Sequence, residues 1–194
     1  MTTDWFAGDP RTNRERMLAG DEYQCVDVDL TDALADAARL AARFGAAYGE
    51  DPDGAQALLP RLLGDIGEAT YIRAPLFVDY GTNITIGSGC FANYGLVALD
   101  VAPITIGDDV QIGPNVQLLT PSHPIDPERR RAKLESAKPI VIGNNVWLGG
   151  GVVVVGGVTI GEDSVIGAGS VVVNDIPPNV IAVGNPCRVV REIP

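Results

Sequence analysis

Residues 140–173 read IVIGNNVWLGGGVVVVGGVTIGEDSVIGAGSVVV and repeat a pattern of six residues without a break. Each unit has one aliphatic side chain at the same position, and in most units a glycine follows it. These aliphatic residues are Ile142, Leu148, Val154, Ile160, Ile166 and Val172. A valine or a serine comes four positions after each of the first five, and the same spacing occurs earlier at Ile106, Ile112 and Leu118.

A period of six residues excludes the two common origins of an apolar repeat. An α-helix repeats about every 3.6 residues and a half-buried strand about every 2 residues. The pattern predicts a solenoid instead, in which each unit forms one flat side of a coil and points its aliphatic residue inward. Successive coils then pair as parallel strands about 4.8 Å apart, with glycine, asparagine and aspartate at the corners. The strict spacing disfavours the alternative, a valine-rich β-sandwich.

One long segment interrupts the repeat. Leu118 and Ile142 are 24 residues apart, and residues 119–139 between them lack the pattern. We expect a loop ejected from one coil. Long insertions on a rigid scaffold often carry functional residues, and this one contains His123, the single histidine of the chain.

The first 70 residues differ in composition from the repeats and are rich in alanine and leucine. Their spacing predicts a helix over residues 29–44, with Asp29 at its start and Gly45 at its end. Shorter helices are expected over residues 53–63 and 12–19. Such helices cannot bury a large core alone, so we expect residues 1–70 to pack as a helical segment against a β-helix domain at 71–194.

Composition excludes several classes of function. The chain carries 14 Lys and Arg against 25 Asp and Glu, a formal net charge of -11, which disfavours nucleic acid and anionic membranes as partners. Its apolar runs are too short to cross a bilayer. Residues 9–16 include several charged side chains, and the N-terminal region lacks the apolar core of a secretory signal, so we expect a cytoplasmic protein. Three scattered cysteines and one histidine encode neither a disulfide framework nor a zinc site, and no metal requirement is expected.

Several motifs together carry a resemblance to a known family. His123-Pro124 with Asp126, residues 144–149 (NNVWLG) and the ending 175–188 (DIPPN to GNPCR) are similar to motifs of the hexapeptide-repeat acetyltransferases. Residues 17–23 (MLAGDEY) and 79–84 (DYGTNI) resemble the maltose and galactoside O-acetyltransferases within that family. The resemblance covers residues 17–193.

The resemblance implies a left-handed parallel β-helix and an acyltransferase that forms homotrimers with each active site between two subunits. It implies direct transfer of an acetyl group from acetyl-CoA to a hydroxyl of a sugar or similar small acceptor. His123 corresponds to the catalytic base of the family, a task that suits an imidazole, and Asn93 to an asparagine near the thioester. The acceptor-binding residues implied in the same way are Asp79, Asp100 and Tyr23.

The donor side matches the family in part. The implied acetyl-CoA contacts are Trp147, Gly150, Ala168, Arg188 and Arg191. Trp147 would border the pantetheine channel, and the two arginines would lie near the phosphates. Asn174 stands where relatives commonly have a lysine, so one phosphate contact is expected to be missing.

The acceptor side departs further from the pattern. Cys25 and Leu34 replace an aspartate and an arginine that are usual in the family, Gly95 replaces a common asparagine, and Ser136 a common aromatic residue. These positions are expected around the acceptor. The sequence therefore leaves the acceptor open.

Two alternative functions remain at the level of the sequence. An antibiotic- or xenobiotic-modifying O-acetyltransferase of the same fold is disfavoured because that group lacks the segment matching residues 17–23. A non-catalytic β-helix scaffold is disfavoured because both His123 and Asn93 are present.

Overall fold

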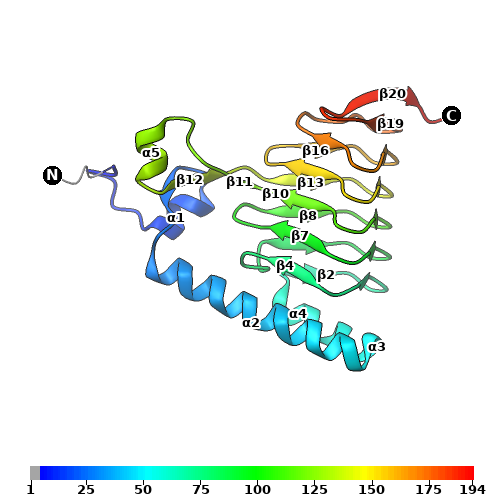
Figure 1. Ribbon diagram of the computed structural model, residues 1–194, viewed down its shortest axis with the longest axis horizontal. Helices are drawn as coiled ribbons and strands as arrows, with labels where there is room; N and C mark the ends of the chain where they lie inside the picture. The colour runs from blue at the N-terminus through cyan, green and yellow to red at the C-terminus, as the bar shows by residue number, and fades with distance from the viewer. Residues whose placement is uncertain (1–4) are drawn as a thin grey trace.

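A column of parallel strands with helices packed at one end forms most of the structure, a computed structural model that describes residues 5–194 (Figure 1). The chain visits three sheets in turn, as the repeat predicts. The first sheet contains β4 (Leu76–Val78), β7 (Leu96–Leu99), β10 (Gln117–Leu119), β15 (Val153–Val155) and β18 (Val171–Val172). The second contains β2 (Asp65–Ile66), β5 (Ile84–Ile86), β8 (Ile104–Ile106), β13 (Ile140–Ile142) and β16 (Thr159–Ile160). The third contains β3 (Tyr71–Ile72), β6 (Phe91–Ala92), β9 (Gln111–Ile112), β14 (Trp147–Leu148), β17 (Val165–Ile166), β19 (Val180–Val183) and β20 (Arg188–Glu192).

The repeat sets the register of the coils. In the second sheet, equivalent residues of successive units lie side by side and all are buried: Ile86, Ile106, Ile142 and Ile160. These stacked side chains form the core, which confirms the prediction of a β-helix. Corners allow close approach only without a side chain, because a Cβ on Gly107 would lie 2.2 Å from Oδ1 of Asn144 in the next coil. Asn115 and Asn145 take the left-handed conformation at other corners.

The N-terminal helices are α1 (Asn13–Leu18), α2 (Val28–Glu50), α3 (Pro52–Ala55) and α4 (Leu59–Leu62), with a short 3₁₀ turn (Gln56–Leu58) before the last. The helix expected over 12–19 is confirmed. In α1, Thr12 and Glu15 form a reciprocal capping box. The helix expected over 53–63 divides into the last three elements.

The bounds predicted for α2 are wrong at both ends. Its N-cap is Asp27, whose carboxylate accepts the backbone amides of Asp29 and Leu30. The helix continues through Gly45 to Glu50 because Phe44, fully buried, packs this part of α2 against the core. Packing outweighs the modest helix penalty of one glycine.

The boundary between the two predicted regions also shifts. Strand β2 already pairs with β5, so the first coil begins at Asp65 rather than after residue 70. Among residues 5–194, the helices are all too short or too polar to cross a membrane.

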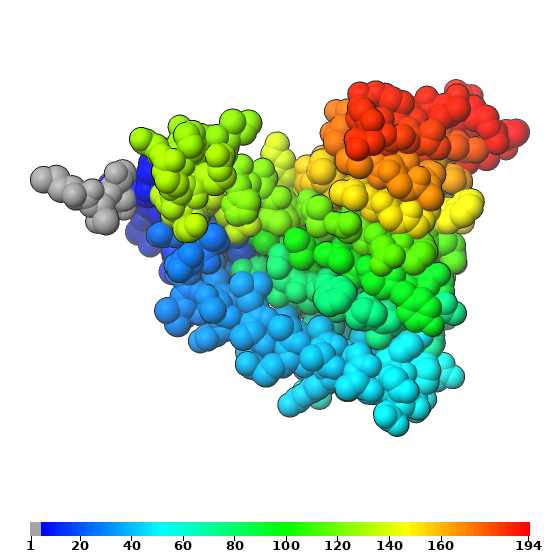
Figure 2. All heavy atoms as spheres, in the orientation of Figure 1, coloured from blue at the N-terminus to red at the C-terminus, as the bar shows by residue number. Residues whose placement is uncertain are grey.

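The segment 119–139 is ordered rather than irregular. It contains β11 (Pro121–Ser122), α5 (Pro127–Arg131) and β12 (Leu134–Ala137). Strand β12 pairs antiparallel with β11 and with β1 (Tyr23–Gln24), which ties the ejected segment to the N-terminal region. Figure 2 shows this lobe in yellow-green, separated by a hollow from the C-terminal coils.

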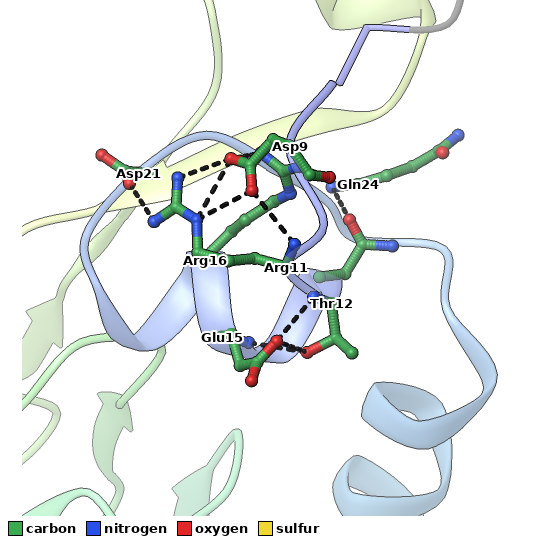
Figure 3. A network of polar contacts seen from close by, with 8 residues as sticks. Asp9, Arg11, Thr12, Glu15, Arg16, Asp21 and Gln24 are labelled. Atoms are coloured by element: carbon green, nitrogen blue, oxygen red, sulfur yellow. Dashed lines mark hydrogen bonds and ion pairs between the residues drawn. The ribbon is translucent and has the colours of Figure 1, made fainter. Parts of the chain in front are cut away.

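A network of charged residues holds the chain that leads to β1 (Figure 3). Asp9 pairs with Arg11 and with the buried Arg16, each at 2.7 Å, and Arg11 also contacts Asp21 at 2.7 Å. Hydrogen bonds from Arg11 hold the pKa of Asp9 below its usual range. The network joins the segment before α1, at Asp9 and Arg11, to Arg16 on α1 and to Asp21 after it, and β1 follows directly.

Candidate active site

His123 lies between β11 and α5, on the ejected lobe. Its side chain is 58% exposed, and its Nε2 lies 4.0 Å from Oε1 of Glu135 on β12. The chain beyond it is held locally, because Asp126 caps α5 and Arg130 donates to the carbonyl of Pro124 at 2.8 Å. The imidazole is thus presented to solvent from a supported loop.

Glu135 is a residue that the sequence analysis missed. The pairing of β1 with β12 places it opposite Tyr23, whose hydroxyl donates to Oε2 of Glu135 at 2.6 Å. No local pattern marks this glutamate, because its surroundings depend on a contact between residues 112 positions apart. The carboxylate bridges a buried phenol and the exposed imidazole.

Tyr23 does not occupy the position expected of an acceptor-binding residue. It is only 1% exposed, and its hydroxyl is used by Glu135. Burial, together with the carboxylate of Glu135, raises the pKa of Tyr23 well above its usual range. In this structure Tyr23 supports Glu135 rather than offering its ring to a ligand.

Asp100 also differs from expectation. It is fully buried, and its Oδ1 accepts the backbone amides of Asp79 at 3.1 Å and Tyr80 at 2.8 Å. Its Oδ2 accepts the amide of Asn83 at 3.1 Å. Backbone amides therefore occupy both oxygens, and the residue holds the 79–83 corner in place of binding an acceptor hydroxyl.

Asp79 remains as the carboxylate that can bind an acceptor. Burial and the nearby charges of Asp100 and Glu135 raise the pKa of Asp79 to about 6. Among residues 5–194, no side chain donates a hydrogen bond or forms an ion pair with its carboxylate. A partly buried carboxylate without a partner costs stability and is typical of a binding site.

We expect Asp79→Asn to stabilise the protein at neutral pH. The folded-state pKa of about 6 lies above the ordinary 3.8, so the folded state binds the extra proton and stability falls as pH rises between these values. The asparagine side chain does not titrate, so this loss of stability is absent from the variant. Thermal unfolding should show that Tm decreases less from pH 4 to pH 7 in Asp79→Asn than in the wild type. Asp32→Asn on α2, an exposed position, is the control. An unchanged pH dependence for Asp79→Asn would contradict this account.

The residues expected on the donor side lie along another corner, where the third sheet turns into the first. Asn93 stacks on the 112–114 turn, since its backbone N–H donates to the carbonyl oxygen of Ile112 at 2.9 Å. The same corner continues through the turns that contain Gly150 and Ala168. The backbone N–H of Gly151 donates to the carbonyl oxygen of Pro114 at 2.8 Å, and that of Gly169 donates to the carbonyl oxygen of Gly150 at 2.9 Å. The structure therefore brings Asn93, Gly150 and Ala168 into one column.

Trp147, Arg188 and Arg191 lie next to this column. Trp147 precedes the Gly150 turn on β14 and is 56% exposed on the outer surface of the third sheet. Arg188 begins β20 directly after the chain turns at the same corner, where the backbone N–H of Cys187 donates to the carbonyl oxygen of Val171 at 2.8 Å. Arg191 lies farther along β20, opposite Ile181. All three side chains are exposed, so a ligand can reach them.

His123 and Asn93 are not neighbours within one chain. The strands of the first sheet start near the Asn93 corner and end at the corner that carries Asp79, Asp100 and the His123 lobe. We call these two sides of the sheet, where its strands start and end, the Asn93 edge and the His123 edge. Residues 93–100 run from one edge to the other through β7, an extended distance of roughly 20 Å. One chain alone therefore does not assemble the two residues expected at the reaction centre.

The first sheet, which separates these corners, has an apolar outer surface. Phe77, 52% exposed, begins a row of neighbouring outward residues. The row continues with Val97, Val153 and Val171, interrupted by Gln117, and a second row contains Leu99, Leu119 and Val155. Equivalent positions of the second sheet are more polar and carry Thr85, Thr105, Val141 and Thr159. An apolar surface of this extent is typical of a protein–protein interface.

Comparison with known proteins adds to this geometry. Family models described as "Bacterial transferase hexapeptide (six repeats)" and "Maltose acetyltransferase hexapeptide capping motif" match residues 139–174 and 16–67. Galactoside O-acetyltransferase of Escherichia coli K12 is 41% identical over 179 residues, with 92% of this chain and 88% of the relative covered. Nodulation protein L of Rhizobium meliloti is 44% identical over 179 residues, with coverages of 92% and 98%.

Solved structures show the same similarity. A maltose O-acetyltransferase from Clostridium difficile 630 superposes with a TM-score of 0.92 at 43% identity, covering 95% of this chain and 98% of that one. A hexapeptide-repeat acetyltransferase from Vibrio cholerae, complexed with acetyl coenzyme A, has a TM-score of 0.87 at 38% identity, with coverages of 95% and 100%.

Proposed function

The chain belongs to the hexapeptide-repeat acetyltransferases, in the group of the maltose and galactoside O-acetyltransferases, and from this we propose that it acetylates a hydroxyl of a sugar or similar small acceptor. Acetyl-CoA is the donor, as in the acetyl-CoA complex of the Vibrio cholerae relative. The observation that carries the proposal is the exposed imidazole of His123 beside the carboxylate of Glu135, at the same edge as the unpartnered Asp79.

In the proposed reaction, the acceptor hydroxyl attacks the thioester carbonyl while His123 accepts its proton. A C–O bond forms, the C–S bond breaks, and the proton passes from His123 to the departing thiolate. Glu135, 4.0 Å away, stabilises the positive charge that the imidazole gains. Asp79 binds an acceptor hydroxyl. No acyl-enzyme intermediate is required.

Asn93 and Gly150 are proposed to stabilise the oxyanion that develops on the acetyl group. Both lie in the same corner column and both can donate hydrogen bonds, one from a side-chain amide and one from a backbone N–H. Among residues 5–194, the N–H of Gly150 has no hydrogen-bond acceptor. Donors that are already in place are worth several kcal/mol in such sites, about 3 kcal/mol for a single group.

The active site is proposed to form between two subunits of a homotrimer. Contact through the apolar surface of the first sheet would place the His123 edge of one chain beside the Asn93 edge of its neighbour. Such a head-to-tail contact uses different surfaces on the two chains and closes into a ring when the rotation allows it. The hollow beside the His123 lobe in Figure 2 leaves space on that side of the molecule.

Coenzyme A is proposed to follow the donor column from Gly150 to Arg188. Trp147 would border the pantetheine arm, and the exposed Arg188 and Arg191 would contact phosphates. A protein of net charge -11 needs local cations to bind a polyanion. The lysine that relatives place at position 174 is absent, so the two arginines carry more of this interaction.

We expect Arg188→Ala to weaken acetyl-CoA binding by about 1–3 kcal/mol, the usual cost of losing a charge-assisted hydrogen bond. If Arg188 contacts the 3′-phosphate, dephospho-CoA should bind the variant and the wild type equally well. Calorimetric titration of both ligands checks this. Arg43→Ala on α2 is the matched control, and equal acetyl-CoA affinity of Arg188→Ala and wild type would place the phosphates elsewhere.

The acceptor is tested by thiol release from acetyl-CoA in the presence of monosaccharides, disaccharides and aminoglycosides. Sugar-dependent release that is lost in His123→Ala supports the proposal. The wall of the site differs from the family pattern at Cys25, where burial and the charge of Glu135 raise the pKa of the thiol. A neutral thiol in place of a carboxylate removes a hydroxyl-binding group, so the preferred sugar is expected to differ from that of relatives. Release with aminoglycosides alone would overturn the sugar assignment.

A further inference from the structure

Arg73 is a cation in the donor column that none of the preceding roles uses. It follows β3, and its backbone amide donates to Ala92 at 2.9 Å, so it lies one coil away from Asn93 in the same corner. Its guanidinium carbon lies 5.2 Å from the ring centroid of Phe91 and 4.8 Å from that of Tyr94. Among residues 5–194, no carboxylate pairs with it.

The guanidinium contacts the side chain of Asn93. Nη1 of Arg73 lies 3.4 Å from Oδ1 of Asn93, and the backbone N–H of Tyr94 donates to the same oxygen at 2.8 Å. Both groups can only donate hydrogen bonds. The oxygen of the Asn93 amide must therefore face them, and a flipped amide would place its NH₂ group against two donors.

We infer that Arg73 is a positioning residue for catalysis, which orients the Asn93 amide so that its NH₂ group faces the reacting acetyl carbonyl. This inference rests on the proposed role of Asn93 as an oxyanion donor. Because it already lies over two aromatic rings, the guanidinium loses little freedom when it contacts the amide. Its positive charge also polarises the amide and makes the NH₂ group a stronger donor.

The role predicts coupling between the two residues. Arg73→Ala should lower kcat about 10-fold, because the amide oxygen of Asn93 then keeps only the N–H of Tyr94 and the donor is held less firmly, with both KM values changed less than about twofold. Asn93→Ala should lower kcat by about 10²-fold, and adding Arg73→Ala to it should change kcat by less than about twofold, because Arg73 then has no amide to orient.

Two further variants separate orientation from folding. Arg73→Lys keeps a cation that can only donate hydrogen bonds but loses the planar group that lies on the rings, so it should lower kcat less than Arg73→Ala does. Arg43→Ala, which removes an exposed arginine of α2 that has no part in the proposed site, is the matched control and should leave kcat unchanged. Thermal unfolding of each variant verifies that the fold is intact.

The outcomes distinguish this inference from the proposed function. If Asn93→Ala lowers kcat but Arg73→Ala does not, or if their effects multiply, the positioning role is wrong while the proposed mechanism stands. An increase in the acceptor KM of Arg73→Ala at constant kcat would show that Arg73 contacts the acceptor, which also overturns the inference. If Asn93→Ala keeps the wild-type kcat, both the oxyanion role and the positioning role fail.

Discussion

Replacing His123 by alanine is expected to lower kcat by about 10²–10⁴-fold, because the acceptor hydroxyl then loses its general base. The imidazole is more than half exposed and contributes little to the core, so Tm should stay within about two degrees of wild type. Steady-state assay of thiol release, with whichever acceptor the screen identifies, measures the first effect and thermal unfolding the second.

Glu135→Gln gives this prediction a second arm. The amide keeps the shape of the side chain but removes the negative charge that stabilises the imidazolium, so kcat should fall by about 10-fold or more with a smaller effect than His123→Ala. Tyr23→Phe removes the hydroxyl that donates a hydrogen bond to Glu135, and its effect on kcat should be smaller than that of Glu135→Gln. Activity of His123→Ala within tenfold of wild type would refute the base mechanism.

Mixed trimers of two inactive variants are expected to regain activity. If each site combines His123 of one chain with Asn93 of its neighbour, a trimer that contains both His123→Ala and Asn93→Ala chains has one intact site of three. Its turnover should be about one third of wild type, at least tenfold above either parent. Co-expression of the two variants with different affinity tags, followed by purification on both tags, isolates the mixed trimers.

The control for this experiment is co-expression of two differently tagged His123→Ala chains, which should remain inactive. Light scattering should give a mass about three times the 20.3 kDa of one chain. Mixed trimers as inactive as their parents, or a fully active monomer at micromolar concentration, would show that one chain forms a complete site.

The sequence by itself determined the architecture of the β-helix. Each unit of six residues turns the same aliphatic position inward, so Ile106, Ile142 and Ile160 stack in register without any information from distant parts of the chain. The helix α1 was equally predictable, because Thr12 and Glu15 form its cap through local hydrogen bonds. The interruption of the repeat at residues 119–139 likewise marked the lobe that carries His123.

The candidate site needed the tertiary structure. The contact of Glu135 with Tyr23 joins residues 112 positions apart, and the burial of Asp100 follows from a corner that wraps around its carboxylate. The end of α2 was set by packing of Phe44 rather than by the local preference of Gly45. Repeats and caps are encoded by short-range chemistry, whereas the role of a side chain depends on which distant groups the fold places beside it.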